Sequence, residues 1–134
     1  MLLWTEGLEL GIDLIDNQHR EIFEQINKLI LSFDEGTEQE SAYDVLCFIE
    51  DYVNKHFTTE EFYLQKYEYQ DLANHIQMHR AFSKHLDDYK VSHRRSGMTR
   101  HAAIEMNEFL TSWWQNHILK IDSKYVEEIG EKII

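Results

Sequence analysis

The 134-residue sequence contains no proline and only five glycines. Both residues interrupt helices, proline because it lacks the amide hydrogen and glycine because it loses the most backbone entropy on folding. Their scarcity therefore favours long, unbroken helices. The sequence also lacks the alternation of apolar and polar residues that is typical of strands, as well as internal repeats and low-complexity segments. These absences predict an all-α protein.

Basic residues and cysteines are also few. Lys and Arg number 13 against 25 Asp and Glu, which gives a formal net charge of −12 at pH 7. This acidic excess disfavours nucleic acids and anionic membrane surfaces as partners. The single cysteine, Cys47, cannot form an internal disulfide, so we interpret it as a small core residue in a cytoplasmic protein. No apolar run approaches the roughly 20 residues of a membrane helix, and we expect neither a signal peptide nor a membrane anchor.

Apolar residues recur with the period of an amphipathic helix in four segments, at 13–33, 42–67, 72–89 and 103–121. A basic loop is expected at 92–97, and a short amphipathic helix at 125–133. An irregular N-terminal arm precedes the first helix, with Trp4 and Leu10 as its packing anchors. Short connections make successive helices antiparallel. The sequence therefore predicts one domain, residues 1–134, folded as an up-down antiparallel four-helix bundle with this arm and a short C-terminal helix.

Six polar residues fall on the apolar stripes instead of the solvent faces: His19, His56, Glu60, His75, His79 and His117. The spacing of four residues from His56 to Glu60, and from His75 to His79, places each pair on one helical face. Buried imidazoles and carboxylates are costly unless they are paired or bound to metal. Because all four expected helices contribute to this set, a shared metal site explains it better than an unusually polar core does.

The ligand types indicate which metal is involved. Imidazole with carboxylate suits iron, zinc, copper or nickel, whereas magnesium and calcium prefer oxygen ligands. Six or seven ligands exceed what one ion accepts alongside an exogenous ligand, so we infer two ions bridged by carboxylates. A nitrogen-rich site without sulfur favours iron over zinc. The Glu-x-x-His motif of ferritin-like di-iron sites and the His-Glu-x-x-His motif of zinc proteases are both absent from the sequence.

Asp122 is a seventh candidate that spacing alone does not support. It follows His117 by five residues, which is about 140° around a regular α-helix. A regular helix therefore directs its side chain away from the site. Asp122 can join the other residues only if the helix unwinds or widens near its end.

Four motifs follow Trp4 in the chain: Asp16-x-Gln18-His19, His56-Phe57-x-x-Glu60-Glu61, His75-x-x-x-His79 and Trp113-x-x-x-His117-Ile118-x-x-x-Asp122. In these motifs the sequence resembles the hemerythrin family, in its single-domain bacteriohemerythrin form, over nearly the whole length. The resemblance implies two iron ions per chain, bridged by an oxo or hydroxo group and two carboxylates. It implies that three histidines hold one iron, two hold the other and two acids bridge them: His75, His79 and His117; His19 and His56; Glu60 and Asp122.

The resemblance also implies reversible binding of O2, for storage, delivery or buffering rather than for catalysis. These ligands leave the two-histidine iron one position short, and oxygen is expected there. Reversible binding requires a dry, apolar pocket, and Phe57, Trp113 and Ile118 match the positions that line it. Two alternatives remain open: an enzyme that reduces peroxide or nitric oxide, and an O2 or iron sensor that acts through an unknown protein partner.

The sequence departs from the family pattern at a few positions. Trp114 stands where leucine is common beside the oxygen pocket, and its side chain either narrows this pocket or points outward. The family's Gly-Tyr-Pro loop is replaced by the sequence at 68–70, with an expected effect on loop rigidity only. His85, His93 and His101 match no ligand position, and we expect them in solvent or at helix ends.

Overall fold

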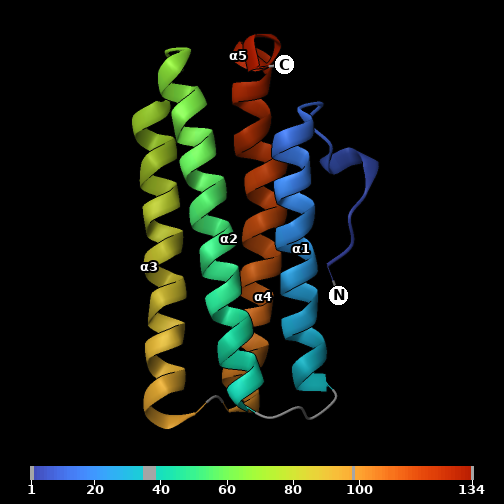
Figure 1. Ribbon diagram of the computed structural model, residues 1–134, viewed down its shortest axis with the longest axis vertical. Coiled ribbons are helices and arrows are strands. Elements are labelled where there is room, and N and C mark those ends of the chain that lie inside the picture. Colours follow the sequence, from blue (N-terminus) through green and yellow to red (C-terminus); the bar gives the residue numbers. More distant parts are fainter. Residues whose placement is uncertain (1, 35–38, 98, 134) are drawn as a thin grey trace.

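A computed structural model describes residues 2–34, 39–97 and 99–133, and these residues form helices without strands (Figure 1). The elements are, in chain order, a 3₁₀ turn η1 (Glu6–Leu8), α1 (Asp13–Asp34), α2 (Gln39–Lys66), α3 (Leu72–Ser96), α4 (Arg100–Asn116), a π-helical segment η2 (His117–Asp122) and α5 (Ser123–Ile133). Among the described residues, no helix is both long and apolar enough to cross a bilayer. The predicted all-α class is confirmed.

The long helices lie side by side as an up-down bundle (Figure 1). The η2 segment and α5 follow α4 without a break in the chain, and α5 turns at the end of the bundle, where Figure 1 shows it nearly end-on. Helix α1 packs against α2 and α4, and α2 also packs against α3. The buried apolar residues form two clusters along the bundle, one containing Ile22, Val53 and Leu110 and the other containing Ile15 and Leu64. On α1 and α2, the predicted ligands lie between residues of the two clusters. The bundle therefore holds a polar layer between two apolar cores.

The N-terminal arm packs against this bundle, as predicted. Trp4 and Leu10 are half-buried against the core, but Leu2 and Leu8 are buried more deeply and are the stronger anchors. The Asn27 side chain fixes the start of the arm, because its Oδ1 accepts from the Leu2 amide at 2.9 Å and its Nδ2 donates to the Leu2 carbonyl at 2.8 Å. The arm thus covers one side of α1.

The arm joins α1 through a turn held by Asp16. The two carboxylate oxygens of this buried residue accept from the amides of Leu10 at 2.9 Å and Gly11 at 3.1 Å. Gly11 has a φ of 87°, which glycine adopts without a steric cost. The motif around His19 therefore includes a residue that anchors the start of its helix.

The prediction that α3 ends before a loop at 92–97 was wrong. The helix continues to Ser96, and Gly97, with a φ of 72°, ends it while donating its amide to the His93 carbonyl at 2.9 Å. Helix α4 then begins three residues earlier than its apolar stripe, because the Thr99 hydroxyl caps it by accepting from the Ala102 amide at 3.1 Å. The arginines at 94, 95 and 100 made this region look like a polar loop in the sequence, but the first two belong to the end of α3 and the third begins α4.

The turn between α2 and α3 contains the one non-glycine residue with positive φ in the described chain, Glu68 at 53°. The amide of Tyr69 bonds the Leu64 carbonyl at 2.9 Å, which is the hydrogen bond of a helix C-terminal motif that usually carries glycine. This is the position where the family's loop reads glycine. A side chain here costs on the order of 1 kcal/mol in backbone strain.

We therefore predict that Glu68→Gly stabilises the protein by about 0.5 kcal/mol, because relief of the strain exceeds the added entropy of the unfolded chain. Urea unfolding of the metal-free protein measures this difference. Glu68→Ala is the matched control, since it removes the same carboxylate but retains the strain, and it is expected to leave the free energy of unfolding nearly unchanged. Equal stability of the two variants would show that the turn is unstrained.

Candidate metal centre

The structure buries all seven residues that the sequence singled out as ligands. Their exposed fractions lie between 0% and 3%, for His19, His56, Glu60, His75, His79, His117 and Asp122. Helices α1, α2 and α3 contribute to this set, together with the η2 segment that follows α4. Side chains of this kind are almost never buried so completely without a compensating partner.

The side chains meet in two groups that share one carboxylate. Glu60 lies with His75, His79 and His117 in the first group and with His19, His56 and Asp122 in the second. Each residue of a group offers one possible ligand atom, and within each group these atoms all lie within 4.8 Å of one another. The structure therefore brings together all seven predicted residues in a three-histidine and a two-histidine group.

The carboxylate of Asp122 lies between the two groups. Its Oδ1 is 3.1 Å from Nε2 of His117 and 3.3 Å from Nε2 of His75, while its Oδ2 is 3.3 Å from Nε2 of His19. Glu60 directs Oε1 at Nε2 of His56, at 3.1 Å. Each oxygen of Asp122 thus faces a different group, which is the arrangement of a bridging carboxylate.

The π-helical segment η2 explains how Asp122 reaches this position. A π-helix closes its hydrogen bonds between residues five apart, so such residues lie near one another on the same face. At the end of η2, the Ser123 amide bonds the Ile118 carbonyl five residues earlier. The helix therefore widens between His117 and Asp122, as the five-residue spacing required. Single π-turns of this kind are frequent at functional sites.

In His56 and His79, a hydrogen bond at Nδ1, the ring nitrogen that points away from the centre, determines that Nε2 faces the centre as an acceptor. Nδ1 of His79 lies 2.8 Å from the Glu61 carboxylate, and Nδ1 of His56 lies 2.9 Å from Oε1 of Gln18. Both oxygens are acceptors, so both Nδ1 atoms donate. The Gln18 amide is oriented by Thr59, whose hydroxyl accepts from Nε2 of Gln18 and donates to a backbone carbonyl. Nε2 of each neutral ring therefore presents a lone pair to the centre.

The lone pair of His79 faces another acceptor, Oε1 of Glu60, at 3.3 Å. Nε2 of His56 lies 2.9 Å from Nε2 of His19, so the two rings either share one proton in a hydrogen bond or, without that proton, direct two lone pairs at each other. Among the described residues, six buried polar atoms at the centre have no hydrogen-bond partner, and they repel one another when all of them are deprotonated: Oε1 of Glu60, Nε2 of His75, His79 and His117, and both oxygens of Asp122. Cations between these atoms would remove the repulsion.

The spacing also fits transition-metal ions. Such an ion holds imidazole nitrogens at roughly 2.0–2.1 Å, so two nitrogens at right angles around it lie about 3 Å apart. The separation of 2.9 Å between Nε2 of His19 and Nε2 of His56 matches this value. Five imidazoles and two carboxylates without sulfur suit iron better than calcium or magnesium.

The electrostatics of the cluster favour positive charge at the centre. Burial alone would raise the pKa of Glu60, but the facing imidazoles, His56 first among them, hold this pKa well below its usual value. The pKa of Asp122 is lowered in the same way, against the effect of burial, chiefly by His117. Burial lowers the pKa of His75, but its contacts with the two carboxylates raise it to about 9. The layer thus attracts cations, whether protons or metal ions.

Tyr125 belongs to the site although the sequence gave no signal for it beyond an apolar stripe. Its buried hydroxyl donates to Oε2 of Glu60 at 2.7 Å. Burial and the nearby Glu60 raise the pKa of Tyr125 well above its usual value, so the phenol remains a proton donor. Tyr125 therefore fixes the orientation of the carboxylate that the two groups share.

Aromatic side chains surround the two groups. Trp114 is fully buried, with its ring centroid 6.1 Å from that of His19 and 5.8 Å from that of His56. Phe57 stacks on the ring of His79 at 3.7 Å. Of the two orientations considered for Trp114, the structure thus has the inward one, beside the two-histidine group. The side chain of Ile118 is likewise buried in the apolar cluster next to the site.

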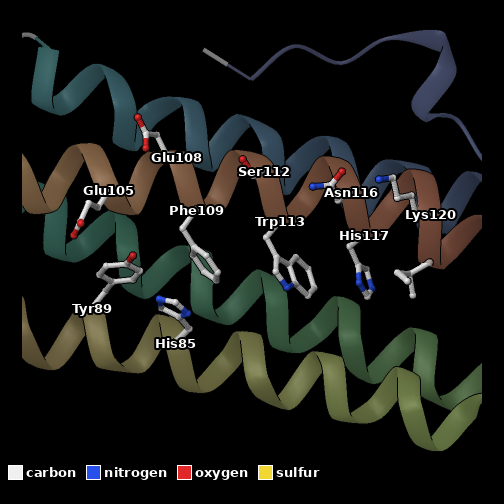
Figure 2. A pocket seen from close by; sticks show the side chains of 11 residues that line it. His85, Tyr89, Glu105, Glu108, Phe109, Ser112, Trp113, Asn116, His117 and Lys120 are labelled. Carbon is white, nitrogen blue, oxygen red and sulfur yellow. The ribbon is translucent and has the colours of Figure 1, made fainter.

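On the three-histidine side, a groove of about 810 Å³ lies between α3 and α4 (Figure 2). Phe109, Trp113 and His117 project from the α4–η2 rod toward α3 along this groove (Figure 2). Trp113 is half-buried and stacks on the His117 ring at 4.3 Å and 11°. His117 itself lines the groove beside Trp113, whereas Trp114 lies deep in the core.

The three remaining histidines lie outside both groups. His85 is exposed and stacks on Phe109 at 3.9 Å, and His101 is exposed near the start of α4. His93 lies in the last turn of α3, as expected, but it is only 8% exposed because it packs against Tyr43. None of them is placed to act as a ligand.

Known proteins resemble this chain over almost its full length. The family described as "Hemerythrin HHE cation binding domain" matches residues 10–129, a range that contains all seven clustered residues. A bacteriohemerythrin of Clostridium acetobutylicum is 31% identical over 130 residues, covering 95% of this chain and 100% of the relative. A bacteriohemerythrin of Pseudomonas paraeruginosa is 32% identical, covering 96% and 81%. One of Campylobacter jejuni is 28% identical, covering 93% and 92%.

We predict that His79→Ala removes the ability to hold two metal ions, because the three-histidine group loses a ligand and Glu60 loses a facing nitrogen. Metal content after loading with ferrous iron, together with the visible spectrum, measures the loss. His101→Ala is the control, since this exposed histidine lies outside both groups. A His79→Ala protein with two bound irons and an unchanged spectrum would refute the assignment.

Proposed function

The chain belongs to the hemerythrin family, and on that premise we propose that it binds molecular oxygen reversibly at a non-heme di-iron centre. The role that follows is storage, delivery or buffering of oxygen rather than catalysis. The observation that carries this proposal is the convergence of seven buried acceptor side chains, in two groups, on one layer of the bundle.

Under this proposal the three-histidine group holds one iron and the two-histidine group holds the other. Asp122 and Glu60 would serve both ions, because Glu60 belongs to both groups and Asp122 faces both. Oδ2 of Asp122 faces His19 and Oδ1 faces His117, which supports a bridging role for this carboxylate. Glu60 uses Oε2 to accept from Tyr125 in the structure, so its full bridging requires a small rotation or the sharing of that oxygen. When bound by these residues, an iron pair would supply reversible electron transfer to oxygen.

The protein's own side chains keep this exchange reversible. Two histidines leave their ion with one ligand fewer than the three-histidine ion has, so the open position is expected beside His19 and His56. Trp114 lies closest to this pair among the proposed pocket residues, and Phe57 stacks between Trp114 and the other group. These apolar rings exclude water and supply no acidic proton, which limits the side reactions that would consume the oxygen.

Oxygen titration tests the proposal. Iron-loaded, reduced protein is exposed to oxygen in steps while the absorption spectrum and dissolved oxygen are recorded, and the oxygen pressure is then lowered. We expect one oxygen molecule to be taken up for each pair of irons and returned intact. Consumption of oxygen without return, or rapid turnover of peroxide or nitric oxide with a reductant, would favour the enzymatic alternative instead.

Trp114 is predicted to limit oxygen exchange. Replacing this fully buried indole by the smaller leucine opens space beside His19 and His56, so Trp114→Leu should accelerate oxygen release or autoxidation by about tenfold, equivalent to about 1.4 kcal/mol in barrier height. Stopped-flow release and slow spectral decay measure the two rates.

Phe109→Leu is the matched control for this prediction, because Phe109 lies on the groove side and stacks on His85 rather than on a ring of either group. If both variants retain two irons, and Trp114→Leu exchanges and oxidises at the rates of the unmodified protein, Trp114 does not control access.

A further inference from the structure

The histidines of the two groups differ at the ring nitrogens that point away from the centre. In the three-histidine group, Nδ1 of His79 donates to a carboxylate, that of Glu61, at 2.8 Å. In the two-histidine group, Nδ1 of His56 donates to a neutral amide oxygen, that of Gln18, at 2.9 Å. The two hydrogen bonds have nearly the same length, so the difference between the groups is one of charge.

The surroundings preserve this difference. The Glu61 side chain is 32% exposed, at a crevice of about 300 Å³ between α2 and α3, so water contact limits the cost of its negative charge. Arg80 also lines this crevice, but among the ion pairs of the described residues Glu61 pairs with His79 alone. Gln18 is fixed in its orientation by the hydroxyl of Thr59. Glu61 therefore remains the charged acceptor of His79, and Gln18 the neutral acceptor of His56.

An anionic acceptor does more than orient the ring. A hydrogen bond to an ionised group is roughly twice as strong as a neutral one, and it makes the imidazole a more electron-rich metal ligand. The orientation of His79 is already restricted, because Phe57 stacks on its ring at 3.7 Å and 5°. The distinct contribution of Glu61 is therefore its charge.

We propose that Glu61 is a positioning residue that acts through His79 to lower the reduction potential of the three-histidine iron below that of the two-histidine iron, which Gln18 supports with a neutral partner. This inference rests on the proposed di-iron centre. It means that the first electron to leave the reduced centre comes from the three-histidine side. The ion with the open position would then be the second of the two to be oxidised.

Three isosteric variants test the assignment in the iron-loaded full chain. Glu61→Gln removes the charge but retains an acceptor for His79, and Gln18→Glu places a charge behind His56. The double variant Gln18→Glu/Glu61→Gln moves the carboxylate from one group to the other without changing the net charge or composition. Glu131→Gln, at an exposed position on α5, controls for the loss of one charge elsewhere. Circular dichroism and iron content establish that each variant is folded and loaded.

The readouts are the two one-electron midpoint potentials, from a spectroelectrochemical titration, and the Mössbauer spectrum of the half-oxidised protein. Mutation of a hydrogen-bond partner behind a metal ligand typically changes metal affinity or activity 10–100-fold. A tenfold change in the ratio of ferric to ferrous affinity corresponds to about 59 mV for one electron. Glu61→Gln should raise the lower potential by on the order of 59 mV or more. Gln18→Glu should lower the higher potential, and the double variant should place the first ferric ion on the two-histidine side.

Unchanged potentials in both single variants, with two irons bound, would overturn the inference. So would a double variant that is oxidised first on the same side as the unmodified protein. If Glu61→Gln fails to hold iron, Gln18→Glu alone decides, because it adds a charge while Nδ1 of His56 keeps an acceptor. An unmodified protein with two separated potentials that does not return oxygen contradicts the proposed function but not this inference, whereas one that binds no iron contradicts both.

Discussion

The whole structure depends on an electrostatic conflict in the middle of the bundle. The Nε2 atoms of the imidazoles and the carboxylate oxygens face one another in a buried layer, and without a proton or a metal ion between them they are all acceptors. Leaving such atoms buried and unpaired is costly. Two apolar clusters, one on each side of the layer, hold the helices in place despite this cost. The long helices without proline provide the rigid frame that aims the side chains at a common centre, where cations resolve the conflict.

Much of the site could be predicted because helical geometry converts sequence spacing into direction. Residues four apart share a face, so the pairs His56 with Glu60 and His75 with His79 had to point the same way. Their position on otherwise apolar stripes predicted that they point inward. Asp122 is different, because its five-residue spacing predicts the wrong direction in a regular helix. Only the resemblance to a family placed it in the site, and the π-helical segment now provides the physical reason.

The sequence could not predict contacts between residues on different helices, because helical spacing relates only residues of the same helix. Tyr125 reads as an ordinary core residue, yet its hydroxyl orients Glu60 from 65 positions away in the chain. The direction of Trp114 depends on how α4 is rotated within the bundle, which its stripe does not determine. The same limit applies to the contrast between Gln18 and Glu61, since it exists only once α1, α2 and α3 are packed together.

The central claim is that this buried layer holds two metal ions, and anomalous X-ray diffraction at the iron absorption edge tests it most directly. Crystals of the iron-loaded protein should show two anomalous peaks among the seven side chains, one beside the three-histidine group and one beside the two-histidine group, with Asp122 between them. A single peak, or peaks at surface carboxylates with the central layer free of metal, would contradict the account.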